Sequence, residues 1–525
     1  MNASAARTDN RPPRLGAAVA ALVGVLALAA ALAAGHLLAA FLGPNASPFL
    51  AVGNGAIDLT PVELKDFAVR TFGTYDKLVL LSGMAVTMLL AAAVAGLLSR
   101  RHALPGLVVI GLFGAVGVFA VYNRPDLGAV ALLAPVASLV AGVLVFRWLH
   151  RRALAALTDR SPEPADAAVA PNRRSFLVAG AGVAVGAGVA GLAGQLVGSG
   201  KDVAGSRAAV GKLVPARTAP PIPADADFAK LGTPPFITSN RDFYRVDTAL
   251  VVPQVTTEDW SLRIHGMVDR ELTFGYQDIR GRPLVERTIT MTCVSNEVGG
   301  PYISTANFIG VELADLLAEA GVRPGAEQLF CTSVDGWNSG TPVAAAMDHG
   351  RGAMLAIGMN GEPLPVEHGF PARMVVPGLY GYVSATKWVT DIEVTTWRAR
   401  QAYWLKRSWA EQAPIKTQSR IDSPKGFENV SGGKVRVSGV AWAQHTGIAA
   451  VEVRVDQGPW QRATLSAEVN KDTWRMWWTE LDVPPGTHQV SCRATDQSGA
   501  TQTDRRAGTV PDGATGWHTV SFNAG

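Results

Sequence analysis

Five long apolar runs fill most of the first two hundred residues and constrain the fold more than any other feature. Each run is close to or above the ~20 residues that a helix needs to cross a bilayer, and none contains Asp, Glu, Lys or Arg. A cleaved signal peptide would not recur five times. The sequence therefore predicts an N-terminal all-α transmembrane bundle over residues 1–200, with helices near Leu15–Leu42, Leu78–Leu98, Ala103–Tyr122, Leu127–Phe146 and Phe176–Val197.

Arginine clusters between the runs indicate their orientation. Short loops on the cytoplasmic side of a membrane carry an excess of Lys and Arg. The clusters precede the first run, follow the second, and separate the fourth from the fifth. All three then lie in the cytoplasm, and an odd number of crossings places everything after Gly198 outside it, as part of a multi-pass protein of the cell membrane. The clusters are Arg7, Arg11 and Arg14; Arg100 and Arg101; and Arg147, Arg151, Arg152, Arg160, Arg173 and Arg174.

The fifth run opens with Arg173-Arg174-Ser175-Phe176-Leu177 and is rich in Gly and Ala. This pattern resembles a twin-arginine export signal placed inside a multi-pass chain. The alternative, that the two arginines only anchor a helix end, is equally open. No convincing small-residue cleavage site follows, so we expect the fifth helix to remain as an anchor.

Composition excludes several classes of protein. The basic residues are not clustered as a nucleic-acid reader requires, and the net charge is only +4 over 525 residues. The three cysteines are too few for a disulfide framework or a four-cysteine iron–sulfur cluster, and no Cys-x-x-Cys-His haem site occurs. Any electron-transfer partner must therefore be a separate protein or carrier, such as a cytochrome or a quinone-linked system.

The remaining chain divides into a linker and two domains. Residues 201–232 contain several prolines among Ala and Asp, which predicts a semi-extended linker. Residues 233–400 mix short strands with a helix over Val311–Ala320, which predicts an α+β domain. Residues 401–525 hold short alternating strands separated by turns, which predicts an immunoglobulin-like β-sandwich.

The stretch Thr288–Gly300 contains the first candidate functional residue. Thr288, Ile289 and Thr290 are β-branched and favour a strand, and the glycines that follow end it, so Cys293 lies where strand becomes loop. A thiolate there is a soft ligand suited to a heavy transition metal. The alternative is a core cysteine that acts as a small hydrophobic residue.

A second motif, His368-Gly-Phe-Pro-Ala-Arg373, is followed by Lys387-Trp388. Together with Cys293, this motif resembles the sulfite oxidase family of mononuclear molybdenum enzymes. The resemblance covers residues from about Thr233 to the C-terminus. It implies that the cysteine binds molybdenum, that the His-Gly-Phe-Pro-x-Arg segment holds molybdopterin, and that the C-terminal sandwich supports a homodimer.

The resemblance also assigns roles to individual residues. The cofactor does the chemistry, a two-electron oxygen-atom transfer, while the protein orients it. Arg373 and Lys387 offer cations to the pterin phosphate, and His368 can donate a ring N–H. By motif position, the further cofactor contacts are Asn240 and Asn296, and the further catalytic residues are Arg245 and Asp335.

Two departures from the family pattern bear on the substrate. Sulfite-oxidising members follow the cysteine with Cys-x-x-Asn-Arg-Arg, whereas this chain keeps Asn296 but has Glu297 and Val298. In the first cofactor loop those members carry Arg before the Asn, where this chain has Ser239. An anionic substrate needs positive charge near the metal. We therefore expect sulfite to be a poor substrate.

Three functions remain open from the sequence. The first is oxidation of a small oxyanion, and the second is reduction of an S-oxide or N-oxide. The third is a noncatalytic, membrane-anchored binding module that keeps a relic of the fold. Metal content separates the third from the other two.

Overall fold

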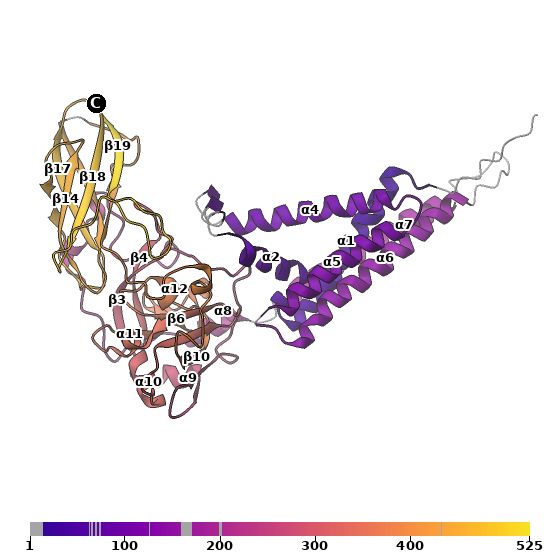
Figure 1. Cartoon of the computed structure of the whole chain (residues 1–525), viewed down its shortest axis with the longest axis horizontal. Helices are drawn as coiled ribbons and strands as arrows, with labels where there is room; N and C mark the ends of the chain where they lie inside the picture. The colour runs from indigo at the N-terminus through magenta and orange to yellow at the C-terminus, as the bar shows by residue number, and fades with distance from the viewer. Residues whose placement is uncertain are drawn as a thin grey trace, which may run out of the picture. The chain divides into compact units, whose positions relative to one another are not determined.

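The computed structural model describes residues 14–61, 64, 67–68, 71–72, 75–124, 126–158, 171–198, 202–431 and 433–525. It divides into two compact units (Figure 1). The first runs from the N-terminus to Lys201 and includes Thr248–Val251, and the second holds Asp202–Asp247 and Val252–Gly525. Each unit is described by itself below.

Among the described residues of the first unit, five helices are long and apolar enough to span a membrane, and each overlaps one of the five apolar runs. Helix α1 packs against α4, α6 and α7. A Cβ on Gly24 of α1 would lie 2.0 Å from the carbonyl oxygen of Ala92, and one on Gly96 of α4 would lie 2.0 Å from that of Ala20. Small residues thus let the two backbones touch. The helices are α1 (Ala17–Leu42), α4 (Asp76–Leu98), α5 (Leu104–Tyr122), α6 (Leu133–Thr158) and α7 (Pro171–Gly198).

A further helix lies between the first two spans. Helix α2 (Pro48–Leu59) follows α1 and packs against α5. Pro48 stands at the first helical position, where its missing N–H costs nothing. Ala51 and Gly53 are buried.

The residues predicted as a linker are part of the second unit. Helix α8 (Val203–Val210) begins at Asp202, whose side chain accepts a hydrogen bond of 2.7 Å from the Gly205 N–H. Arg207 of this helix donates to the Leu364 carbonyl. Further on, the Ala216 N–H donates to the Leu284 carbonyl, so the extended stretch lies along a strand. The side chains of Arg173 and Arg174, the proposed export signal, lie outside the described residues.

The first part of the second unit is built on two sheets. One has the strand order β3-β4-β7-β8, with β9 also paired to β7, and the other has the order β2-β1-β10-β5-β6. Helix α10 begins at Leu313 rather than Val311, because Val311 and Glu312 complete β4. The elements are β1 (Ser261–Gly266), β2 (Leu272–Gly275), α9 (Tyr276–Arg280), β3 (Val285–Thr292), β4 (Ile303–Glu312), α10 (Leu313–Ala320), β5 (Gln328–Ser333), β6 (Asn338–Pro342), α11 (Val343–Met347), β7 (Met354–Met359), β8 (Glu362–Pro363), β9 (Arg373–Val375), α12 (Gly381–Ser384) and β10 (Val389–Thr395).

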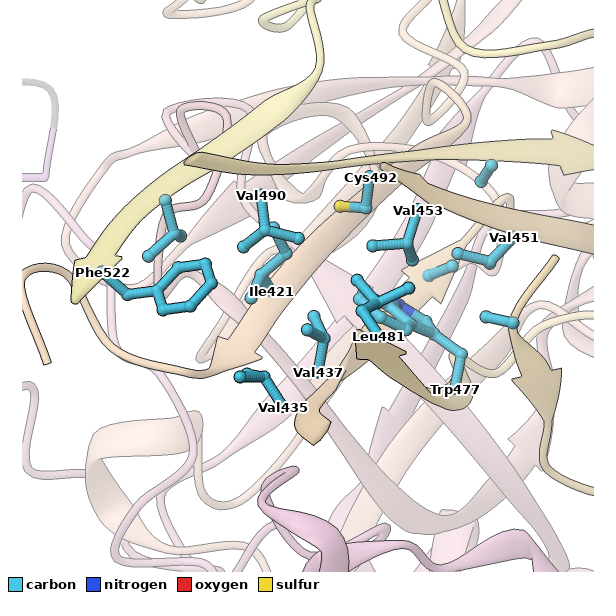
Figure 2. Packing of buried hydrophobic residues seen from close by; sticks show 14 of the residues in the cluster. Ile421, Val435, Val437, Val451, Val453, Trp477, Leu481, Val490, Cys492 and Phe522 are labelled. Carbon is cyan, nitrogen blue, oxygen red and sulfur yellow. The ribbon is translucent and has the colours of Figure 1, made fainter. Parts of the chain in front are cut away.

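The C-terminal part is a β-sandwich. Its sheets have the orders β11-β13-β17-β16 and β12-β19-β18-β14-β15. Trp477, Phe522 and Cys492 are fully buried between them with a set of aliphatic residues (Figure 2). The strands are β11 (Gln418–Ser423), β12 (Asn429–Val430), β13 (Gly433–Trp442), β14 (Ile448–Val455), β15 (Gln461–Arg462), β16 (Thr464–Leu465), β17 (Arg475–Val483), β18 (Gly486–Asp496) and β19 (His518–Ala524).

Candidate active site

Cys293 follows the last residue of β3, at the start of a closed loop. Its backbone N–H donates to the Tyr302 carbonyl at 3.0 Å, and its own carbonyl accepts from the Asn296 N–H at 3.1 Å. The Asn296 Oδ1 atom accepts a hydrogen bond of 2.8 Å from the Tyr302 N–H. Asn296 is buried, and its Nδ2 donor has no hydrogen-bond partner among the described residues. The loop therefore fixes the thiol and presents a buried amide donor beside it.

The His368–Arg373 segment folds back on the residues around Lys387. Arg373 and Lys387 form a backbone bridge, and the Trp388 Nε1–H donates to the Val366 carbonyl at 2.9 Å. Gly369 has a φ of +112°, and a Cβ there would lie 3.1 Å from the Cβ of Arg373 and 3.2 Å from the Cα of Lys387. Only glycine suits that conformation and that space. The fold thus brings the two cations of the motif side by side.

Arg373 is a buried cation with no carboxylate bound to it among the described residues. It is 3% exposed, and its guanidinium donates to three carbonyls, that of His368 at 3.2 Å and those of Met374 and Ala385 at 3.5 Å. Burial lowers its pKa to about 10, so it remains charged at neutral pH. Such a buried cation is costly unless an anion compensates it. Its surroundings therefore suit an anionic ligand.

Lys387 and Arg245 both form ion pairs with the carboxylate of Asp247. The Asp247 Oδ2 atom lies 3.0 Å from the Lys387 Nζ atom and 2.9 Å from the Arg245 Nε atom. Burial, and then the charges of Arg373 and Arg245, lower the pKa of Lys387 to about 8, although Asp247 acts in the opposite direction. Three cations thus stand near one acid, an excess of positive charge that a phosphate can neutralise.

His368 presents a hydrogen-bond acceptor rather than the donor that the sequence predicts. Its Nε2 atom lies 3.0 Å from the carbonyl oxygen of Asn240, which can only accept, so the ring hydrogen is on Nε2. Burial, with the charges of Lys387 and Arg373, lowers its pKa to about 3. The ring is therefore neutral, and its buried Nδ1 has a lone pair without a partner among the described residues.

Asn240 acts through His368. Its backbone carbonyl orients the imidazole, while its side-chain oxygen accepts from the Asn360 amide at 2.8 Å and its side-chain nitrogen donates to Glu362. Asp335 has a local contact, because its Oδ1 atom accepts from the Trp337 N–H at 3.2 Å in the turn between β5 and β6. This contact does not join Asp335 to Arg245, Arg373 or Lys387, and its catalytic role stays a prediction.

Sequence reasoning missed two residues of the site, Tyr244 and Asp247. The ring centroid of Tyr244 lies 6.4 Å from that of Tyr302. A Cβ on Gly381 would lie 4.0 Å from the Tyr244 hydroxyl and 3.9 Å from the Thr292 carbonyl, so the hydroxyl lies close to the end of β3. Burial and then the Cys293 thiolate raise the pKa of Tyr244, which keeps it a neutral donor. The sequence feature that could have indicated Tyr244 is the Phe243-Tyr244 pair directly before Arg245.

Comparison with known proteins decides which family this site belongs to. Residues 249–404 match the family described as oxidoreductase molybdopterin binding domain. Over 323 residues the chain is 31% identical to the mitochondrial sulfite oxidase of Macaca fascicularis, covering 52% of this chain and 59% of the relative. Residues 249–404 are a molybdopterin-binding oxidoreductase domain of the sulfite oxidase type.

Two further similarities were found. An uncharacterized oxidoreductase of Bacillus subtilis, YuiH, is 32% identical over 136 residues, which cover 26% of this chain and 65% of the relative. The crystal structure of the sulfane dehydrogenase SoxCD from Paracoccus pantotrophus aligns with 55% of this chain and 84% of that chain, at 24% identity and a TM-score of 0.49. The chain spans about 59% of the length of the mammalian sulfite oxidases that it matches.

Molybdopterin is the cofactor of this sulfite oxidase family, and the residues present fit it. The excess of buried positive charge at Arg373 and Lys387 suits its phosphate. The unpaired Nδ1 of His368 and the Nδ2 of Asn296 suit polar groups of the pterin, since buried polar atoms need hydrogen-bond partners. The Cys293 thiol, only partly buried, is placed to reach a metal.

Replacing Arg373 by Ala should remove cofactor more than fold. Removing one partner of a desolvated charge pair costs roughly 2–5 kcal/mol of binding. At about 1.4 kcal/mol per tenfold, affinity for molybdopterin should fall at least tenfold. Pterin per chain in the purified protein measures this. Arg263→Ala is the matched control, because that side chain is 50% exposed and paired to Glu271 at the surface. Wild-type pterin occupancy in Arg373→Ala would contradict the assignment.

Cofactor retention should weaken as pH rises through the pKa of Lys387. The ammonium form binds phosphate, and its pKa of about 8 before the ligand binds means that this charge is present below pH 8 and lost above it. Affinity should fall by up to about tenfold per pH unit above 8. Pterin remaining after dialysis at pH 7 and pH 9.5 tests this.

Lys387→Arg is the matched variant for the pH experiment, because arginine keeps its charge at both pH values. It should retain cofactor equally at pH 7 and pH 9.5. If it loses pterin at high pH as the wild type does, another group controls the dependence.

Proposed function

We propose that this chain is a membrane-anchored molybdopterin-dependent oxidoreductase that performs two-electron oxygen-atom transfer, with Cys293 as the protein ligand of the metal. One observation carries the proposal. The partly buried thiol at the end of β3 shares its surroundings with three cations, the buried Arg373 and Lys387 and the more exposed Arg245, that one carboxylate only partly neutralises.

Each residue has a task in this proposal. When bound, the cofactor supplies two-electron redox chemistry and the exchange of an oxygen atom. Cys293 holds the metal as a thiolate, while Arg373 and Lys387 fix the phosphate. His368 accepts and Asn296 donates hydrogen bonds to the pterin. The Tyr244 hydroxyl donates a hydrogen bond toward the reacting centre and orients an oxygen atom of the substrate.

The substrate that best suits this site is a neutral or zwitterionic S-oxide or N-oxide. Positions that supply arginine in the sulfite-oxidising pattern hold Ser239 and Glu297. Two nearby arginines are already paired with carboxylates, Arg241 with Asp242 and Arg245 with Asp247, so their charge is partly neutralised. A compact dianion needs cations at short range, whereas a polar S–O or N–O group needs only hydrogen-bond donors such as Tyr244.

Oxidation of a small oxyanion is the second candidate. It rests on the relatives, several of which are named sulfite oxidases. Arg407 could serve such a substrate, although its guanidinium stacks on the Tyr403 ring at 3.6 Å. In either direction, the electrons require a separate partner, for which a cytochrome or a quinone-linked carrier is suitable.

The surroundings of the catalytic domain belong to the same proposal. The five apolar helices and the arginine clusters support a multi-pass anchor with the active site outside the cytoplasm, delivered by a twin-arginine signal at Arg173 and Arg174. The two packed sheets of residues 401–525 support an immunoglobulin-type domain that joins two copies into a homodimer.

Purified wild-type protein from a host that makes the cofactor should contain one molybdenum per chain. Cys293→Ser should abolish turnover because a hydroxyl is a poor replacement for a soft thiolate ligand. Elemental analysis with a turnover assay tests both statements. Cys492→Ser serves as the control, since Cys492 lies in the sandwich core. Molybdenum-free wild type would end the enzyme proposal.

Steady-state assays should show sulfite to be a poor substrate. Sulfite with an artificial electron acceptor is compared with sulfoxides and N-oxides supplied with a reduced dye. We expect the oxides to turn over and sulfite to stay well below a kcat/KM of about 10⁴ M⁻¹s⁻¹, the lower end of the ordinary range. A sulfite value at or above that level would mean that another arginine binds the anion.

Protease added to spheroplasts should digest the catalytic domain while the membrane remains closed. The expectation follows from an odd number of crossings after a cytoplasmic N-terminus. Full protection of the domain would mean that the number of crossings is even. Replacing Arg173 and Arg174 by Lys tests the export signal, because unchanged delivery of active domain would favour simple helix anchoring.

A further inference from the structure

Strand β3, which leads to Cys293, is an edge strand. Arg217 pairs with Val285 at its start, and the C-terminal sandwich covers the open side of its second half. The Thr290 N–H donates to the Asp472 carbonyl at 2.9 Å. The Thr288 carbonyl accepts from the Asn470 side chain at 3.0 Å. An edge strand otherwise presents unpaired backbone groups, so residues of the sandwich take the place of a neighbouring strand.

Gln444 reaches the end of β3, next to the thiol. Its Nε2 atom donates to the Thr292 Oγ1 atom at 2.9 Å and to the Thr290 carbonyl at 3.2 Å. Gln444 is 3% exposed and follows β13 of the sandwich. Both contacts fall on the three residues before Cys293, so they fix the strand where it gives way to the loop.

The loop after Cys293 is held from the same side. Arg420 of β11 donates through Nη1 to the Gly300 carbonyl at 2.9 Å and through Nε to the Asp422 carboxylate at 2.8 Å. A Cβ on Gly299 would lie 2.3 Å from the His518 ring, so the loop backbone lies directly against β19. Both sides of the thiol are therefore bound to the sandwich.

We propose that the C-terminal sandwich positions the metal-binding cysteine, with Gln444 holding the strand before it and Arg420 the loop after it. The metal-binding role of Cys293 rests on the proposed function, whereas the clamp itself rests on these contacts. Arg420 and Gln444 are positioning residues, since neither is in the set that would touch the cofactor. The sandwich is then part of the active site's support, in addition to any role between two copies.

Amide hydrogen exchange of the full-length protein tests the clamp. The variants Arg420→Met and Gln444→Leu each remove hydrogen bonds while keeping an extended side chain. We expect amides of residues 294–303 to exchange about tenfold faster in Arg420→Met, the ratio for loss of one hydrogen bond of about 1.4 kcal/mol. Amides of residues 288–293 should respond similarly in Gln444→Leu. Arg420→Lys, which keeps a donor, should recover part of the protection.

Arg436→Ala is the matched control, because this β13 arginine is 47% exposed and pairs with Glu480 away from the cysteine loop. It should leave exchange at residues 288–303 unchanged. The clamp is supported if faster exchange in the two test variants is confined to those residues and absent from the core strands β14 and β18. It is overturned if residues 288–303 exchange as in the wild type in both variants.

The outcome is separable from that of the proposed function. Exchange rates do not depend on turnover, so a wild type without molybdenum would end the enzyme proposal and leave the clamp testable. As a second readout, the rate of molybdenum loss during dialysis against a chelator should rise several-fold in Arg420→Met. Equal loss from the variant and the wild type would show that the clamp does not support the metal.

Discussion

The site depends on charge that the folded protein cannot neutralise by itself. Arg373 and Lys387 are placed together by one backbone bridge and removed from water by the packing around Gly369 and Phe308. A single acid, Asp247, stands against them and Arg245. Burying charge is unfavourable unless it is compensated, so the arrangement is complete only with an anionic ligand. The neutral His368 ring and the Asn296 amide add hydrogen-bonding atoms with fixed directions to a site that attracts an anionic ligand mainly by its charge.

Support for this charge cluster and for the thiol comes from different parts of the second unit. Residues 368–387 fold back on themselves and carry Arg373 and Lys387. Strand β3 and the sandwich instead hold the residues on both sides of Cys293. Thr290 of β3 shows how the sandwich holds this strand, since its hydroxyl accepts from the Trp474 backbone N–H and its own backbone N–H donates to the Asp472 carbonyl. The two halves can therefore be tested separately, because Arg373 lies in the charge cluster whereas Arg420 contacts the loop after Cys293.

Local patterns in the sequence predicted the five apolar helices, the strand before Cys293 and the pairing of His368, Arg373 and Lys387 in one motif. They could not predict contacts that depend on distant segments. Asp247 lies 140 residues from Lys387, and Gln444 lies 152 residues from Thr292. The direction of the His368 hydrogen bond was missed for the same reason, because it is set by the carbonyl of Asn240, 128 residues away. Proline content suggested a linker, yet Arg217 in that stretch pairs with Val285 at the start of β3.

The neutral state of His368 has a consequence for a protein exposed to varying acidity. An ordinary histidine changes charge near pH 6.5, within the range that many environments cross. With a pKa of about 3, this ring keeps its Nε2 hydrogen on Asn240 and its lone pair on Nδ1 down to pH 4. Mild acid therefore leaves the hydrogen-bond polarity of this nitrogen intact. The burial that makes the cluster costly to form also keeps this ring in one protonation state as the surroundings become mildly acidic.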